Sequence, residues 1–412
     1  MTLDDESIDR LRRSTLAYAS EREYTGWDYA DGLSSAFVRS LPIESKLVNL
    51  AVQETIKRAP VNLRPLFLVE QRRNYKGAAL FALATLDLYE RSGEDRYARE
   101  GRSLLEWLLE AQNDWCAGFG GGGHRHPLQD LSSDGASTPG EVSGVVSTSY
   151  AVRALLRGSD ALSEPRYADV ARTASDFLFE DLAYEEVDEG ARINYTASRD
   201  GSTDREAYTL NANALGARLL LDLFDRFGDR RLREAATAIL EYVASKQTAS
   251  GGWMYADPPT ASHLSMDNFH NGFIVESFLR HRDVTGDDRF EPTLERAATF
   301  YRERLFDDDG APRWDESSAY PRDVHAAAQG IVVFAELGDL AFARRIIEWT
   351  RDALYAGGGQ FYYQQRRWYT KRFTLMRWCQ AWMSYALSRY LRCRRLGASG
   401  EAAARPRVPS TE

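Results

Sequence analysis

The sequence predicts an all-α protein whose helices close into an (α/α)6 toroid, a barrel of six helical hairpins with short β-hairpin loops at one end. Three observations predict this fold. An apolar helix, a Gly-Asp type turn and an amphipathic helix recur in five segments. The two helices of each pair differ in kind, and long loops alternate with short turns. Self-similarity of this kind indicates repeated supersecondary units.

The five repeated segments are spaced along the chain, at 88–112, 155–182, 223–247, 281–306 and 334–354. In these turns the Gly suits a helix C-cap and the Asp suits the N-cap of the next helix. The second helix of each pair carries one apolar stripe and one charged face, which is typical of an outer helix. Each segment is therefore expected to be a helical hairpin.

The first helices are apolar nearly all round and rich in Ala and Gly, which indicates inner helices buried on most sides. They are predicted to begin near 75, 147, 209, 269, 324 and 373. The last inner helix has no partner downstream, and a helix near 45–58 is expected to complete its pair.

An open helical solenoid is the main rival architecture, but variable repeat length and variable loops favour the closed toroid. The long loops, at 113–146, 182–208, 248–268, 306–323 and 355–372, all lead into inner helices. They are therefore expected at one end, around a funnel where function would lie. We divide the chain into an N-terminal helix and loop that packs on the toroid (1–44), the toroid (45–394) and a disordered tail (395–412).

Composition excludes several classes of protein. The 412 residues include 52 basic and 61 acidic side chains, a net charge of −9, which argues against nucleic-acid binding. The three cysteines (116, 379 and 393) are scattered and suit a reducing compartment. We expect a cytoplasmic protein because neither a signal peptide nor a transmembrane segment is apparent, and a lipid-linked substrate could hold it at the inner membrane face.

The loops before the inner helices mix Gly, aromatic and polar residues, a composition typical of a carbohydrate-binding lining. Trp253 is a candidate for stacking on a sugar ring, although such an aromatic could equally plug the barrel rim. Tyr208, Asn211 and Asn213 open the third inner helix and are candidates for binding sugar hydroxyls. Helix capping would be a sufficient structural reason for one of the two asparagines.

The segment 366–378 is the densest basic cluster and contains Tyr369, Arg372, Arg377 and Trp378. Arginine binds a carboxylate through two hydrogen bonds, so the cluster suits an anionic sugar. Neighbouring cations would lower the pKa of a Tyr369 phenol and make it a candidate acid or base. The alternative is a solvated basic loop.

Two adjacent inner helices begin with a histidine close to an aspartate. His270 follows Asp267 by three residues and His325 follows Asp323 by two. Both pairs are expected to face the funnel, against the alternative of capping or core hydrogen bonds. These four residues could ligate a divalent metal, but their spacing does not require one. We therefore assign no metal or other cofactor.

Several segments resemble a family of α/α-toroid proteins from prokaryotic polysaccharide and glycan assembly clusters. They are Asn74–Leu80, Tyr208–Asn213, Asp267–Phe273, Tyr320–Gln329 and Met376–Met383. The Gly-rich stretch in the 113–146 loop departs from that pattern. The stretch 366–383 is also similar to the catalytic domain of D-glucuronyl C5-epimerases. The first resemblance implies glycan assembly, and the second implies a reaction.

These inferences lead to epimerisation at C5 of glucuronic acid within a glycan, which gives iduronic acid. Arg372 and Arg377, with a protonated His270, would neutralise the sugar carboxylate. Tyr369 would exchange one proton, and His325 or Tyr320 the other. Asn211, Asn213 and Asp267 would hold hydroxyls, together with Asp323, Trp253, Tyr208 and Trp378 as further binding candidates. The partner would be a uronate-containing glycan, which could be lipid-linked.

Two other functions stay open at this stage. A glycoside hydrolase would use Asp267 and Asp323 as paired carboxylates, and a lyase would use the epimerase set to expel the 4-linked sugar. A non-catalytic glycan-binding assembly factor would keep its function after Tyr369→Phe and His325→Ala.

Overall fold

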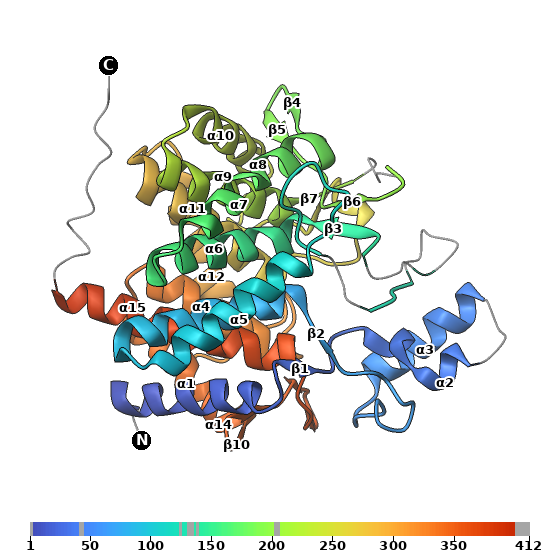
Figure 1. Ribbon diagram of the computed structural model, residues 1–412. Helices are drawn as coiled ribbons and strands as arrows, with labels where there is room; N and C mark the ends of the chain where they lie inside the picture. The colour runs from blue at the N-terminus through green and yellow to red at the C-terminus, as the bar shows by residue number, and fades with distance from the viewer. Residues whose placement is uncertain are drawn as a thin grey trace.

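The computed structural model describes residues 3–40, 45–122, 126–129, 136, 140–201 and 207–399. Within these residues the chain forms the predicted all-α toroid (Figure 1). The disordered tail expected from 395 is wrong for residues 395–399, which continue the last helix. The rest of that expected tail lies outside the described residues.

Six inner helices surround the barrel axis, and they begin close to the predicted positions. They are α4 (Tyr75–Ser92), α6 (Val145–Ala161), α9 (Leu210–Phe227), α11 (Asn268–Thr285), α13 (Val324–Glu336) and α15 (Trp382–Ser399), the last preceded by a π-turn η4 (Met376–Ala381). Each packs on the next, and α15 returns to pack on α4. The ring is therefore closed, which rejects the open solenoid.

The outer helices alternate with the inner ones along the chain. They are α1 (Asp5–Ser20), α5 (Asp95–Glu110), α7 (Pro165–Arg172, continued by α8, Ala174–Asp176, and η2, Phe177–Asp181), α10 (Arg230–Ser245), α12 (Glu291–Arg304) and α14 (Leu340–Leu354). The expected pairing of 45–58 with the last inner helix is wrong. That helix, α3 (Lys46–Arg58), packs on the turn η1 (Asp31–Ser34), whereas α1 packs on α15.

The short turns follow the predicted capping chemistry in most hairpins. Gly93, Gly228 and Gly286 end α4, α9 and α11 in the left-handed conformation that glycine adopts at least cost. The second hairpin differs, because Gly158 lies inside α6. A Cβ there would stand 2.2 Å from a methyl carbon of Leu105, so this glycine permits close packing of α6 on α5.

Two-residue and three-residue strands join the loops at the end where the inner helices begin, which we call the loop end. The antiparallel pairs are β1 (Thr25–Gly26) with β2 (Arg72–Arg73), β3 (Val142–Gly144) with β6 (Thr196–Ser198), β4 (Glu185–Val187) with β5 (Gly190–Arg192), β7 (Tyr208–Thr209) with β8 (Ala256–Asp257) and β10 (Tyr355–Gly357) with β11 (Gln360–Phe361). A three-stranded sheet has the order β13 (Thr370–Lys371), β12 (Gln364–Gln365) and β9 (Arg322–Asp323). Several pairs link loops of successive hairpins and so fix their relative positions.

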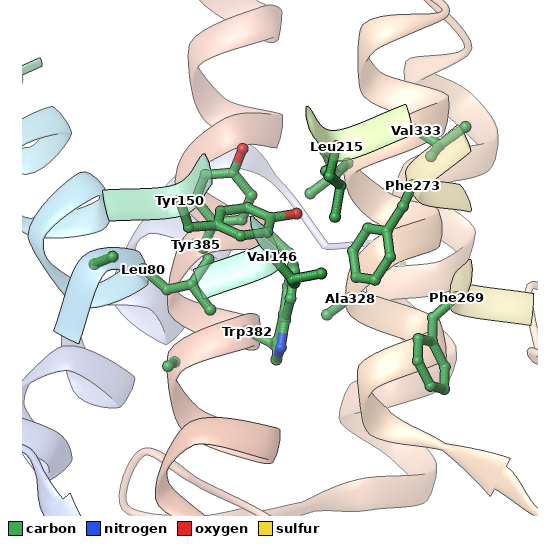
Figure 2. Packing of buried hydrophobic residues seen from close by; sticks show 14 of the residues in the cluster. Leu80, Val146, Tyr150, Leu215, Phe269, Phe273, Ala328, Val333, Trp382 and Tyr385 are labelled. Carbon is green, nitrogen blue, oxygen red and sulfur yellow. The ribbon is translucent and has the colours of Figure 1, made fainter. Parts of the chain in front are cut away.

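Aromatic side chains fill the barrel axis beneath the loop end. Tyr150, Phe273, Trp382 and Tyr385 converge there from three inner helices (Figure 2). The ring centroids of Tyr150 and Trp382 are 5.2 Å apart, and those of Phe273 and Trp382 are 5.5 Å apart. Because aromatic contacts of this kind bury large apolar surfaces, the barrel interior is a packed core rather than a pore.

A buried ionic cluster lies among the inner helices, next to this aromatic core. The carboxylate of Glu276 is fully buried and pairs with Arg153 at 3.1 Å and Arg218 at 2.9 Å. It also accepts a hydrogen bond from Gln329. We call Arg153, Arg218 and Glu276 the central ion cluster. A buried carboxylate between two guanidinium groups satisfies charges that would otherwise be costly to bury.

Candidate functional site

Three stacked rings form the floor of the loop end. The imidazole of His325 lies between the ring of Phe269, at 4.4 Å and 21° between planes, and the ring of Trp382, at 4.3 Å and 28°. Trp378 meets the same imidazole edge-on at 4.7 Å. The first turns of α11, α13 and the last inner helix thus meet at this floor, which we call the ring stack.

His270 stands at the Phe269 end of the ring stack and is oriented by a buried carboxylate. Its Nδ1 lies 2.7 Å from Oδ2 of Asp267. Asp267 is also the N-cap of α11, since its other oxygen accepts from the backbone N–H of His270. An ionised carboxylate can only accept, so Nδ1 carries the proton and Nε2 is left available as a base. The capping role considered for this pair is present, since Asp267 caps α11.

His325 is held as a neutral imidazole. Burial lowers its pKa well below the usual value, and the positive charges of Lys76 and Arg377 act in the same direction. Neither ring nitrogen has a hydrogen-bond partner among the described residues. A buried histidine with two unpaired nitrogens can donate to, or accept from, a ligand placed on the floor.

Lys76 stands at the other end of the ring stack, in the first turn of α4. Its ammonium lies 5.8 Å from the ring centroid of Trp382. Burial, followed by the charge of Arg377, lowers the pKa of Lys76 to about 7. An amine with this pKa is divided between its two protonation states at neutral pH, which is the condition for general acid–base catalysis.

Arg377 is buried beside this lysine and is oriented by Asp28. Its Nε donates to one oxygen of Asp28 at 2.8 Å, and its Nη2 lies 2.8 Å from the other. The Asn74 side chain donates to the same carboxylate. Burial opposes ionisation of Asp28, but the Arg377 charge prevails and lowers the pKa of the carboxyl. Arg377 keeps Nη1, which has no partner among the described residues.

Two tyrosines complete the rim of the loop end. Tyr255 packs edge-on against His270 with ring centroids 4.7 Å apart. Burial raises the pKa of Tyr255, and its neighbours Tyr195 and Asp267 raise it further. Tyr195 is 38% exposed and lies within electrostatic range of Arg377. Tyr195 therefore lies near both Tyr255 and Arg377, and polar groups surround the ring stack.

Three residues predicted to bind sugar hydroxyls have structural roles. The Asn213 amide is used up by the backbone of Ile193 and Thr209. Trp253 is 1% exposed, stacks on Phe278 and donates to the Val243 carbonyl, so it belongs to the core. Tyr208 is buried with its ring beneath Arg192. Of this group only Asn211, at the start of α9, keeps a buried carbonyl oxygen with no partner.

Three residues predicted to be catalytic do not join the cluster. Tyr369 lies at the tip of the β12–β13 hairpin and is 44% exposed, and Arg372 is also exposed. Tyr320 is 37% exposed and lies under Arg322, which pairs with Asp307. Side chains alternate along an extended segment, so the burial of Lys371 turns Arg372 to solvent.

The carboxylates proposed as a hydrolytic pair are both engaged elsewhere. Asp323 accepts from the indole of Trp378 and from Gln364, each at 2.8 Å. Burial raises the pKa of Asp323 to about 6, against these hydrogen bonds. Asp267 is bound to His270. Across the described residues no three metal-ligating side chains converge on a point.

Sequence reasoning missed Lys76 and Asp28 as functional candidates. Lys76 lies in the segment Asn74–Leu80, whereas the partner of Asp28 is remote in sequence: Asp28 and Arg377 are 349 residues apart. The signal that could have found Lys76 is its position. It is the single lysine at the start of an otherwise apolar inner helix, in a chain with five lysines.

Comparison with known proteins places the fold among sugar-processing toroids. No family profile matches the sequence, and no match was found among curated proteins. Cellobiose 2-epimerase from Bacillus thermoamylovorans is similar over 78% of this chain and 88% of its own, with a TM-score of 0.61 and 12% identity. An unsaturated glucuronyl hydrolase specific for heparin is similar over 94% of this chain and 98% of its own, with a TM-score of 0.60 and 14% identity. A D-mannose isomerase is similar over 77% of this chain and 86% of its own, with a TM-score of 0.57 and 11% identity.

Proposed function

We propose that this protein epimerises C5 of a glucuronate residue within a glycan, giving iduronate by proton transfer. The observation that carries the proposal is the placement of two proton-transfer groups at opposite ends of the ring stack. One is Nε2 of His270, oriented by Asp267, and the other is the Lys76 amine, whose pKa of about 7 suits either role.

The proposed step needs only a proton removed and a proton returned. One group removes H5 as the C5–H bond breaks, and the electron pair passes into the adjacent carboxyl group. The other group delivers a proton to the opposite face of C5, so no oxidant or reductant is consumed. Nη1 of Arg377 would bind the substrate carboxylate, and His325 and Asn211 would bind hydroxyls.

The structural neighbours support a sugar substrate and leave a second reaction open. Cellobiose 2-epimerase and D-mannose isomerase share the fold. Their names describe an epimerisation and an isomerisation of sugars. The glucuronyl hydrolase shares it over nearly the whole of both chains, which makes cleavage of a uronate-containing glycan the second candidate.

The test is incubation with a glucuronate-containing oligosaccharide in D2O, followed by mass spectrometry and NMR of the uronate. The proposal predicts iduronate with deuterium at C5 and unchanged chain length. Because the group that removes H5 differs from the group that returns a proton, deuterium should appear in the product before it appears in residual substrate. Shortened chains would replace the proposal with hydrolysis or a lyase reaction, and absence of both changes would favour a binding protein.

A further inference from the structure

The chain exposes its large apolar side chains in two segments rather than over its whole surface. Nine such residues are exposed in the described part of the chain, and seven belong to these segments. Five lie in residues 35–69 and two lie at the β12–β13 tip: Phe37, Leu47, Val61, Leu66, Leu68, Trp368 and Tyr369. Single exposed apolar residues are ordinary, but a concentration of them marks an interaction surface.

The first segment contributes a helix that is barely buried. Of the 13 residues of α3, only Gln53 and Ile56 are buried, although Leu47, Val48, Leu50 and Val52 are apolar. Figure 1 shows α3, with the short helix α2 (Ala36–Arg39), lying beside the barrel rather than within its ring. Leu47 is exposed and Val48, Leu50 and Val52 are only partly covered by the described part of the chain.

Contacts join the two segments to each other and to the loop end. The Lys371 ammonium donates to the Lys57 carbonyl at 2.9 Å, and Arg64 lies 5.6 Å from the ring centroid of Phe373. Lys57 lies over the ring of Tyr29, which stacks on Trp378 of the candidate site at 4.6 Å. We call residues 35–40, 45–69 and 366–372 together the apolar-basic face.

The charge of this face opposes that of the whole protein. Residues 35–40, 45–69 and 366–372 contain nine basic side chains, of which Arg64 and Lys371 are buried, and one acidic side chain, in a chain whose net charge is −9. Arg58 and Arg39 are 77% and 46% exposed but pair with Glu54 and Glu70. Arg367 and Arg372 are exposed and form no ion pair in the described part of the chain, so their charge faces solvent. A second copy of the chain would bring two such positive faces together, which disfavours self-association through this surface.

We propose that the apolar-basic face docks on the surface of an anionic lipid bilayer. Apolar side chains that enter the headgroup region beside arginine and lysine are typical of proteins that lie on a membrane. Trp368 and Tyr369 are the residue types that favour this depth. No helix in the described ranges is both long enough and apolar enough to cross a membrane. Docking would bring the loop end close to a glycan carried on a lipid.

The experiment is flotation of the full chain with vesicles of phosphatidylcholine containing 30% phosphatidylglycerol, against pure phosphatidylcholine vesicles. The wild type is expected to float with the anionic vesicles and to be released by 1 M NaCl. The double variant Leu47→Ser with Leu66→Ser should bind at least tenfold more weakly. Arg39→Glu with Arg58→Glu should lose about fivefold for each charge removed. Arg10→Glu with Arg304→Glu, on other exposed surfaces, should bind as the wild type does.

Absence of flotation with anionic vesicles overturns the proposal, as does equal binding by the Leu47 and Leu66 variant. If the wild type does not bind vesicles but forms a dimer, and the Leu47 and Leu66 variant is monomeric, the partner of this face is a second copy of the chain and not a lipid surface. Circular dichroism checks that the variants fold, which their exposed positions favour. The inference stands apart from the proposed reaction, because the deuterium assay on a soluble oligosaccharide reports on the loop end without vesicles.

Discussion

Two groups of buried ionisable side chains lie inside the same barrel, and they are built in opposite ways. In the central ion cluster every charge has a counter-ion: Arg153 and Arg218 both pair with Glu276. At the loop end, burial instead lowers the pKa of Lys76 to about 7 and keeps His325 neutral. Paired buried charges hold a structure together, whereas unpaired basic groups with lowered pKa values are equipped to move protons.

The largest effect is expected when one of the two proposed proton-transfer groups is removed. Lys76→Met and His270→Gln should each reduce deuterium incorporation by about 10²- to 10⁴-fold, since each removes a general acid–base group. The melting temperature of Lys76→Met should stay equal or rise, because an amine that is costly to bury is gone. Lys246→Met, at a surface pair with Asp257, is the matched control. Full activity in Lys76→Met would remove this lysine from the mechanism.

The pH dependence follows from the same lysine. If Lys76 removes H5 it must be neutral, and the rate of exchange should rise with pH through about 7; if it returns the proton it must be charged, and the rate should fall over the same range. A profile that is flat between pH 6 and 8 would contradict this assignment.

The next effect breaks the central ion cluster. Glu276→Ala leaves two buried guanidinium groups without their carboxylate and should cost about 3 to 5 kcal/mol in the free energy of unfolding. Glu303→Ala, at an exposed position, should change it by less than about 0.5 kcal/mol. Denaturant titration of both variants measures the difference, and a stable Glu276→Ala protein would show that the cluster is not structural.

A smaller effect concerns the loops that place the site. Asn213→Ala removes hydrogen bonds to the backbone N–H and carbonyl of Ile193 and should cost about 1 to 3 kcal/mol. Asn211→Ala, two residues earlier, removes a side-chain oxygen that has no hydrogen-bond partner among the described residues, and should instead weaken substrate binding. If Asn213→Ala altered KM alone, with stability unchanged, its assignment as a structural residue would fail.

His281, at the far end of α11 from the loop end, is a buried histidine whose lowered pKa should affect stability rather than proton transfer. Burial lowers its pKa to about 4, so the unfolded chain binds a proton that the native state does not between pH 4 and 6.5. Stability from this residue is therefore present above about pH 6.5 and is lost as pH falls toward 4. His281→Leu should reduce that acid sensitivity by on the order of 1 kcal/mol. Chemical denaturation of the wild type and of His281→Leu at pH 6.5 and pH 4 measures how far the free energy of unfolding falls with pH. An equal fall in both proteins would contradict the lowered pKa of His281.

The smallest effect is expected at the hairpin tip. Tyr369→Phe and Arg372→Gln should change the exchange rate on a soluble oligosaccharide by less than about twofold, because both residues lie outside the ring of polar groups around the stack. A hundredfold loss in Tyr369→Phe would return this tyrosine to the mechanism.

The sequence was sufficient for the toroid and for part of the site. Apolar periodicity and Gly-Asp turns located the inner helices, and the spacing of Asp267 and His270 placed both residues at the start of one inner helix. It was insufficient where side chains from remote segments meet. α1 was not recognised as an outer helix because its buried Arg12 pairs with Asp9 and Asp87, and charged residues of this kind read as a solvated face.

Aromatic residues in Gly-rich loops gave the other errors. Trp253 points into the core, whereas Trp378 lies on the ring stack, and composition alone does not distinguish the two directions. The basic cluster at 366–378 divides in a similar way. Arg377 belongs to the loop end, while Arg372 and Tyr369 belong to the apolar-basic face.

The most direct test of the central claim is NMR titration of the protein labelled with ¹³C at lysine Cε. The chain has five lysines, so each resonance can be assigned by substitution. The structure predicts one resonance with a midpoint near pH 7, absent from Lys76→Met, and a second near pH 8 from Lys371, which remains in that variant. If no lysine titrates near pH 7, or if that signal persists in Lys76→Met, the loop end lacks the proton-transfer group on which the proposed reaction depends.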